Sequence, residues 1–170
     1  MIVKNPSKLP QIRRIVTGHD HEGKAIVWLD GPVTNKKASG PSVVSTLMWV
    51  TDESPADFTI DTDAGARILG TAPPEGGTRF CVIDFQPGNN GHMHRTDTVD
   101  YVICIFGEID MYLDDSIVHM KAGDIMIQQG TNHSWVNRGT EPARLAFVLV
   151  DGKPKRAGSV SDVRGSNSSR

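Results

Sequence analysis

Short apolar runs separated by turn residues fill the second half of the chain, and they repeat with the two-residue period of β-strands. Turn residues at 114–115, 121–123 and 138–140 separate several of these runs. Strands this short and evenly spaced predict an all-β sandwich or barrel, and no repeat of fixed length divides it in two. The eight predicted extended segments are Arg79–Phe85, His92–His94, Asp100–Phe106, Ile109–Leu113, Ser116–Met120, Ile125–Gln128, His133–Asn137 and Ala143–Val150.

The first half of the chain is less regular. Three strands are predicted, at Gln11–Thr17, Lys24–Leu29 and Val43–Val50, while residues 33–40 are polar and resemble a loop. Residues 51–77 show no sustained strand pattern and allow only a short turn of helix. A loop of that length in a compact domain is usually functional or disordered. Its carboxylate-rich part is expected to lie over the barrel mouth as a lid.

The length of 170 residues fits one domain. Residues 1–77 are predicted to pack as strands and lid on a barrel core at 78–152, followed by a mobile basic tail at 153–170. A net charge of −2 gives no electrostatic reason to expect a nucleic acid or membrane partner. The chain shows no apolar run of signal-peptide or membrane-span length, so a cytoplasmic location is expected.

Three histidines carry the clearest chemistry in the chain. His92 and His94 are two residues apart in an extended segment, so both imidazoles point to one face. Asp100 begins the following buried strand, and His133 returns on a later hairpin. Three imidazoles and a carboxylate on neighbouring strands are a divalent metal site in outline. The alternative is that these histidines are the polar lining of a metal-free barrel mouth.

The stretch 87–152 resembles the paired motifs of the cupin superfamily, which are small double-stranded β-helix (jelly-roll) barrels. The first motif, G-x5-H-x-H-x3,4-E-x6-G, is matched by His92, His94 and Gly107. Asp100 replaces its glutamate, and five residues rather than three or four separate His94 from Asp100. The opening glycine of this motif is also shifted.

The second cupin motif, G-x5-P-x-G-x2-H-x3-N, is matched by Gly123, Gly130, His133 and Asn137. The interval after Gly123 is one residue shorter than usual, and Gln128 stands at the position of the proline. The two motifs together cover about two-fifths of the chain and occur in the correct order. Extra strands before the motifs are common in single-domain cupins.

The resemblance implies a jelly-roll barrel with N-terminal extra strands, and one divalent metal ion (Fe, Mn, Ni or Zn) in its mouth, bound by His92, His94, Asp100 and His133. It also implies a homodimer. Tyr101, Ile103 and Ile105 alternate outward from the site strand and would supply the apolar face of that interface.

Asp100 has two alternative roles. Aspartate is one methylene shorter than glutamate and would fall short of the metal, unless the longer turn moves the start of the strand. Otherwise Asp100 would orient a histidine through its ring N–H. Direct ligation is the interpretation that we favour, and Asp97 in the same turn competes for either role.

Several side chains are candidates for lining the pocket. Trp135 and Asn137 share the face of His133. An indole there would favour a flat organic substrate, and the alternative role of Trp135 is to fill the barrel core. The alternative role of Asn137 is structural, as a hydrogen-bond partner of a neighbouring loop. The remaining candidates are Val102, Cys104 and Trp49, with Cys104, like Cys81, expected to be a buried reduced thiol.

Two classes of function follow. One is a metal-dependent enzyme that acts on an oxygenated organic acid, ketone or aromatic, polyketide-like substrate, as a dioxygenase, decarboxylase or isomerase, with the dioxygenase favoured. The other is a non-catalytic cupin that binds a small ligand or serves as an accessory subunit. The three histidines favour the enzyme, whereas the missing glutamate favours the binder.

Overall fold

The computed structural model describes residues 9–59 and 61–154, and the regular secondary structure within them is almost entirely β-strand. The predicted basic tail lies outside the described residues except for Lys153 and Pro154. The described elements, in order, are β1 (Arg13–His19), β2 (Ala25–Pro32), β3 (Lys36–Ser39), β4 (Val43–Thr51), the 3-10 turn η1 (Ala64–Ala66), β5 (Thr78–Phe85), β6 (Thr98–Phe106), β7 (Glu108–Tyr112), β8 (Ile117–Lys121), β9 (Ile125–Gln129), β10 (Ser134–Val136) and β11 (Ala143–Asp151).

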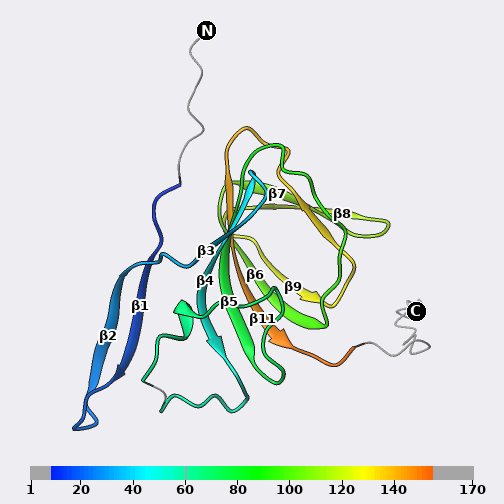
Figure 1. Ribbon diagram of the computed structural model, residues 1–170. Helices are drawn as coiled ribbons and strands as arrows, with labels where there is room; N and C mark the ends of the chain where they lie inside the picture. Colours follow the sequence, from blue (N-terminus) through cyan, green and yellow to red (C-terminus); the bar gives the residue numbers. More distant parts are fainter. Residues whose placement is uncertain (1–8, 60, 155–170) are drawn as a thin grey trace, which may run out of the picture.

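Two sheets form the barrel, as expected of a double-stranded β-helix (Figure 1). The larger has the strand order β3-β4-β5-β11-β6-β9 and the smaller the order β10-β7-β8. Their inner faces bury one apolar core, in which Val102, Ile109 and Leu145 are at most 1% exposed. Strand β6 shows how the sequence produces this core. Its buried and less buried residues alternate with the two-residue period of a strand, so one face of the strand is buried.

The N-terminal hairpin β1-β2 packs against the outside of the barrel as the third, two-stranded sheet (Figure 1). Arg14 on β1 donates hydrogen bonds to the carbonyl oxygen of Met48 and to the carboxylate of Asp63. The rings of Trp28 and Trp49 meet edge to face, with their centroids 6.3 Å apart. These contacts attach the first part of the chain to β4 and to the loop that follows it.

Strand β3 was not expected, because residues 33–40 are polar and lack a strand period. All four residues of Lys36–Ser39 are exposed, and they form an edge strand paired with β4 between Val43 and Thr46. Edge strands are commonly short and charged, since charge prevents pairing with other chains. The hydrogen bonds of β4, rather than an apolar pattern, therefore specify β3.

The outer face of β6 and β9 is apolar and uncovered in the described part of the chain. Tyr101, Ile103, Ile105, Ile125 and Ile127 are each between 41% and 71% exposed. The register pairs Tyr101 with Ile127 and Ile103 with Ile125, so these side chains lie next to one another on one face. The described residues include no helix that is long and apolar enough to cross a membrane.

We expect a second copy of the chain to cover this face. Ile103→Glu would place a carboxylate in the apolar interface, where burying an unpaired charge is costly. Size-exclusion chromatography with light scattering should show a dimer for the wild type and mainly monomer for Ile103→Glu. The control Ile15→Glu changes an equally exposed isoleucine of the N-terminal hairpin and should stay dimeric. A monomeric wild type at micromolar concentration would contradict the expectation.

Candidate functional site

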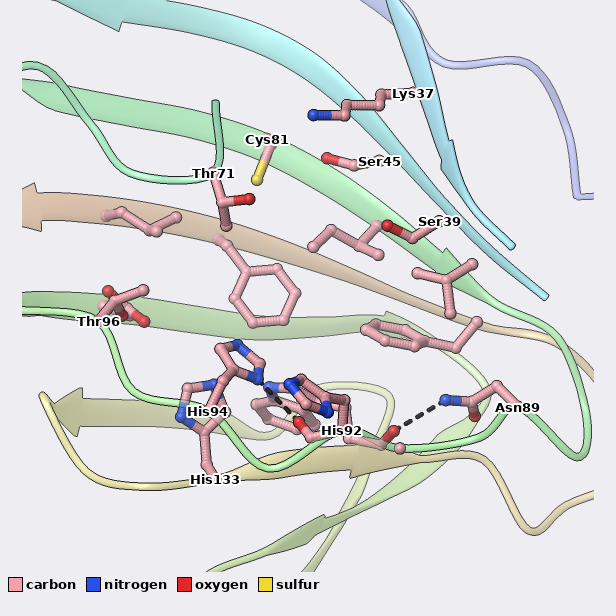
Figure 2. Close-up of a pocket in the computed structure, with 18 of the residues that line it drawn as sticks. Lys37, Ser39, Ser45, Thr71, Cys81, Asn89, His92, His94, Thr96 and His133 are labelled. Carbon is pink, nitrogen blue, oxygen red and sulfur yellow. Dashed lines mark hydrogen bonds between the residues drawn. The ribbon is translucent and has the colours of Figure 1, made fainter. Parts of the chain in front are cut away.

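A cavity of about 520 Å³ opens between the two sheets at one end of the barrel. This volume is within the range of small-molecule sites. Its middle is apolar, and polar side chains gather at two opposite walls (Figure 2). The apolar part is lined by Val43, Ile83, Phe85, Trp135, Phe147 and Leu149.

One wall is built around a backbone bridge between His94 and His133. The amide of each residue donates to the carbonyl oxygen of the other at 2.9 Å, which forms an isolated antiparallel bridge. Residues directly opposite each other in such a pair point to the same face. The two imidazole rings are accordingly close, with centroids 4.4 Å apart. The sequence placed these histidines on neighbouring strands, and the bridge brings them together.

Gly91 permits this approach. A Cβ atom at position 91 would lie 2.2 Å from the Ser134 hydroxyl oxygen and 2.6 Å from a methyl carbon of Val136. Both distances are far below contact distance, so only glycine lets the chain before His92 lie against β10. The close approach of these two segments sets the positions of the histidines.

His92 and His94 share a face, as the two-residue spacing predicts. Their rings are almost parallel, at 7°, with centroids 6.2 Å apart (Figure 2). Nδ1 of His94 lies 2.8 Å from the carbonyl oxygen of His92. His92 and His94 are exposed, whereas His133 is buried. His133 therefore lies deeper in the barrel than the other two histidines.

The hydrogen bonds of His94 and His133 assign the same tautomer to each ring. Nδ1 of His133 lies 2.9 Å from the carbonyl oxygen of Thr131, and Nδ1 of His94 is bonded in the same way to His92. A carbonyl accepts the Nδ1 proton, so Nε2 carries the lone pair in both rings. The amide nitrogen of Gln128 lies 3.5 Å from Nε2 of His133. Burial also lowers the pKa of His133, which favours the neutral imidazole.

Asp100 and Gln128 face each other across β6 and β9, in register. The Gln128 amide nitrogen donates to Oδ2 of Asp100 at 3.0 Å and lies 3.2 Å from Nδ1 of His133. Oδ1 of Asp100 is buried without a hydrogen-bond partner, as is Oε1 of Gln128. Burial raises the pKa of Asp100. Gln128, which the sequence showed only as a departure from the cupin pattern, thus connects Asp100 with a histidine.

The metal ligand set is only partly assembled. Among residues 9–59 and 61–154, no three His, Cys, Asp or Glu side chains are grouped closely enough to hold a metal ion. Two imidazoles whose Nε2 atoms carry the lone pair, and a buried carboxylate oxygen without a hydrogen-bond partner, have the donor chemistry that first-row metals use. His94 and His133 therefore fit a metal as a pair, and ligation by His92 and Asp100 stays a prediction. Asp97, the alternative to Asp100, does not line the cavity.

The opposite wall carries basic and hydroxyl side chains from β3, β4 and β5. Figure 2 shows Lys37, Ser39 and Ser45 there, across the cavity from the histidines. Cys81 and Arg79 on β5 belong to the same wall. Burial raises the pKa of the Cys81 thiol, and the neighbouring Arg79 and Ser45 oppose that rise. The sequence did not predict this wall, because Lys37 and Ser39 lie on β3, in a segment without a strand pattern.

Known proteins resemble this chain over most of its length. A sequence model of the cupin domain matches residues 81–150. The cupin-domain-containing oxidoreductase virC of Hypocrea virens is 32% identical over 156 residues, which is 85% of this chain and 80% of the relative. The chain belongs to the cupin superfamily. The cupin-domain-containing oxidoreductase fogC of Aspergillus ruber is 30% identical over 156 residues, covering 84% and 74% of the two chains.

Two further comparisons agree with this assignment. Phomopsin biosynthesis cluster protein C′ of Diaporthe leptostromiformis is 34% identical over 156 residues, covering 85% of this cupin and 82% of the relative. The cupin domain of Cnp3 from Schizosaccharomyces pombe superposes with a TM-score of 0.51 at 13% identity, over 82% of this chain and 87% of that one. The latter likeness shows the shared fold alone.

The predicted lining residues of this cupin separate into two groups. Trp135 lines the cavity, 6.4 Å from His133 between ring centroids. Val102 and Cys104 share the face of Asp100, as expected, but they lie in the apolar core and do not line the cavity. The barrel tapers to packed side chains below Asp100, so residues farther along the same face of β6 are core.

Trp49 lies outside the barrel, contrary to the expectation from the sequence. A register shift between Leu47 and Trp49 pairs Leu47 with Cys81 but Trp49 with the adjacent Phe80. Adjacent residues on a strand face opposite sides, so this bulge turns Trp49 to the outer face. There its ring meets Trp28 and the guanidinium of Arg14.

The 51–77 loop does not form the lid that the sequence predicted. The 51–77 loop contains the 3-10 turn η1, capped by Asp63, and the carboxylate of Asp52 pairs with Arg67. None of the described residues of the carboxylate-rich part lines the cavity. Gly70 and Thr71, at the end of the loop, do line it. The acidic residues serve as structural anchors, and the uncharged end of the loop forms the cavity wall.

Asn137 is fully buried and connects three segments, away from the cavity. Its Nδ2 donates to the carbonyl oxygens of Phe85 and Glu141, and its Oδ1 accepts from the amide of Gly139. Its own amide donates to Oδ1 of Asn89, which in turn donates to the carbonyl oxygen of Trp135. Asn137 therefore has a structural role and does not line the pocket.

Asn137→Ala should lower the free energy of unfolding by roughly 2–4 kcal/mol, because it leaves buried backbone groups without partners. Urea denaturation followed by circular dichroism measures this change. The control Asn132→Ala removes a half-buried asparagine whose side chain bonds to the exposed Asp114, and it should change stability by less than about 0.5 kcal/mol. Equal effects of the two substitutions would contradict the structural role of Asn137.

Proposed function

We propose that this cupin is an oxidoreductase that acts on a small, oxygenated, largely apolar organic molecule bound in the barrel cavity. The observation that carries the proposal is the His94–His133 pair, two adjacent imidazoles at the wall of a cavity with an apolar middle. Relatives that cover most of the chain are named cupin-domain-containing oxidoreductases, and others are named for biosynthesis clusters. These names support the reaction class and a substrate of secondary-metabolite type.

His94 and His133 would hold a divalent metal ion through their Nε2 atoms. Such an ion supplies Lewis-acid and redox chemistry to a bound oxygenated substrate. With few protein donors, several positions are left for substrate oxygen atoms. The residues around the pair fit iron, manganese, nickel or zinc equally well, since imidazole binds all of them. The dioxygenase class is the favoured subclass.

The other cavity residues orient the substrate. The ring of Trp135 meets the rings of His133 and Phe147 edge to face. The ring centroids of Trp135 and Phe147 are 5.6 Å apart. These rings present flat apolar surfaces next to the histidine wall, and they suit an aromatic or polyketide-like molecule. Gln128 would hold Asp100 and His133 in position from behind the wall.

A non-catalytic binding protein is the second candidate function. The observation that favours it is the lack of a complete three-donor group among the described residues. In that case the cavity would bind a small molecule without converting it. Metal content distinguishes the two candidates, because a binder of this kind needs no ion.

His94→Ala and His133→Ala should each lower metal affinity by at least about 10–100-fold, because each removes one of the two closest donors. Metal analysis of protein purified after loading with Fe(II), Mn(II), Ni(II) or Zn(II) measures the loss. Oxygen uptake with Fe(II) and candidate aromatic acids tests the dioxygenase class. The control His119→Ala removes an exposed histidine paired with Asp110 on the far side of the smaller sheet, and should change neither result. Stoichiometric metal in both site variants would refute the pair as the metal site.

Asp100→Asn should keep the metal, because Oδ2 of Asp100 already accepts a hydrogen bond from Gln128. On this interpretation the carboxylate positions His133 through Gln128 and does not bind the metal itself. The electron paramagnetic resonance or visible spectrum of a Co(II)-loaded sample should nevertheless shift, since the histidine wall loses its charged neighbour. Gln128→Met, which cuts the same connection, should produce a similar shift. Loss of the metal from Asp100→Asn would instead establish direct ligation, as the sequence analysis favoured.

A further inference from the structure

Arg79 is a buried cation without a counter-charge in the described part of the chain. It is 7% exposed, and its Nη1 atom is buried with no hydrogen-bond partner. Its polar neighbours in the wall are the thiol of Cys81 and the hydroxyl of Ser45, neither of which is an anion. The other buried arginine, Arg144, forms a two-point ion pair with Asp84. A buried charge is normally paired, so Arg79 requires an explanation.

Asp100 does not supply the missing charge. The register places Arg79 opposite Leu149 on β11 and Leu149 opposite Asp100 on β6. Two strand spacings therefore separate the backbones of Arg79 and Asp100, about 10 Å. The carboxylate of Asp100 turns to Gln128 on its other side. No ion pair joins Arg79 to Asp100 or to any other described carboxylate.

The surroundings of Arg79 are basic. A second cavity, of about 300 Å³, shares Lys37, Ser45 and Arg79 with the main cavity. Its lining includes Lys36 and Arg67 and no acidic residue. Asp100 is the single carboxylate that lines the main cavity, and it lies toward the histidine wall. The described residues of the wall shared by the two cavities thus are two cations, Arg79 and Lys37, and one hydroxyl group, with no anion. Arg67 of the second cavity is already paired with Asp52.

We infer that Arg79, with Lys37 and Ser45, is the recognition site for a carboxylate group of an organic acid bound in the cavity. The guanidinium fork matches a carboxylate in two-point geometry, and the bound anion would neutralise the buried charge. Lys37 adds a second positive charge from the edge strand β3, and the Ser45 hydroxyl adds a donor. That the acid is the substrate rests on the proposed function, whereas the binding of an acid does not.

The cavity then orients its ligand from end to end. The carboxylate lies at the β3-β4-β5 wall, the apolar body contacts Ile83, Phe85 and Phe147, and the far end reaches His94 and His133 (Figure 2). An acid bound in this way directs its non-carboxylate end to the histidines. The reacting group is therefore distant from the carboxylate, which disfavours a decarboxylation of that same group.

The test measures binding of 2-naphthoate and of its neutral counterpart 2-naphthamide by calorimetry, with metal-free protein so that the carboxylate cannot bind a metal ion. Wild type should bind the acid at least about 10-fold more tightly than the amide. Arg79→Met should lose about 10–100-fold in affinity for the acid and little for the amide. The control Arg13→Met removes an exposed arginine of the N-terminal hairpin and should change neither affinity.

Stability provides an independent readout. Without ligand, Arg79→Met should melt at the same temperature as wild type or higher, because the substitution removes an unpaired buried charge. The acid should raise the melting temperature of wild type and not that of the variant. If Arg79→Met does not fold, Arg79→Gln, which removes the charge but keeps hydrogen-bonding groups, replaces it in both measurements.

Three results would overturn the inference. These are equal affinities of wild type for acid and amide, unchanged acid binding by the charge-removing variant, or tighter binding of 2-naphthyl phosphate than of 2-naphthoate. His94→Ala separates this inference from the proposed function. Acid binding that survives in His94→Ala supports the recognition site even if metal binding fails there, whereas its loss would move the carboxylate to the histidine wall and overturn the assignment to Arg79.

Discussion

Strand β11 is the constraint on which the cavity depends, because it pairs with β5 on one side and with β6 on the other. Leu149 stands opposite both Arg79 and Asp100, and Asp100 stands opposite Gln128 on the next strand. A slip of one residue would turn every one of these side chains to the other face of the sheet. The apolar residues of β11, which fill the core, therefore also hold the polar residues of the cavity in one row.

That row carries a free-energy cost in the absence of a ligand. Arg79 and Asp100 are both largely desolvated, each has a polar atom without a partner, and β11 keeps them apart. In a packed interior these charges would pair or be replaced by apolar residues. Unsatisfied groups that persist in a natural protein occur mainly at functional sites, where a ligand satisfies them. This is the basis on which we propose a ligand with an acidic end and an oxygenated end.

Asp100 and Gln128, which replace the glutamate and the proline of the cupin motifs, are in contact. The shorter carboxylate leaves a gap that the glutamine side chain reaches across, to a hydrogen bond of 3.0 Å. A proline at position 128 could not make that bond, and a glutamate at position 100 would need the space that the amide occupies. The two substitutions are therefore understandable as one change, which connects the wall of β6 with His133.

The sequence by itself determined the all-β class, most strand positions and the grouping of His92, His94 and His133, because these follow from local periodicity and from motif spacing. Only the tertiary structure decided three further features. Strand β3 exists through its pairing with β4, a bulge turns Trp49 away from the barrel, and Arg79 and Lys37 line one cavity from different strands. Such features depend on hydrogen bonds between segments distant in sequence, on a register shift that the two-residue period does not encode, and on which charges burial leaves unpaired.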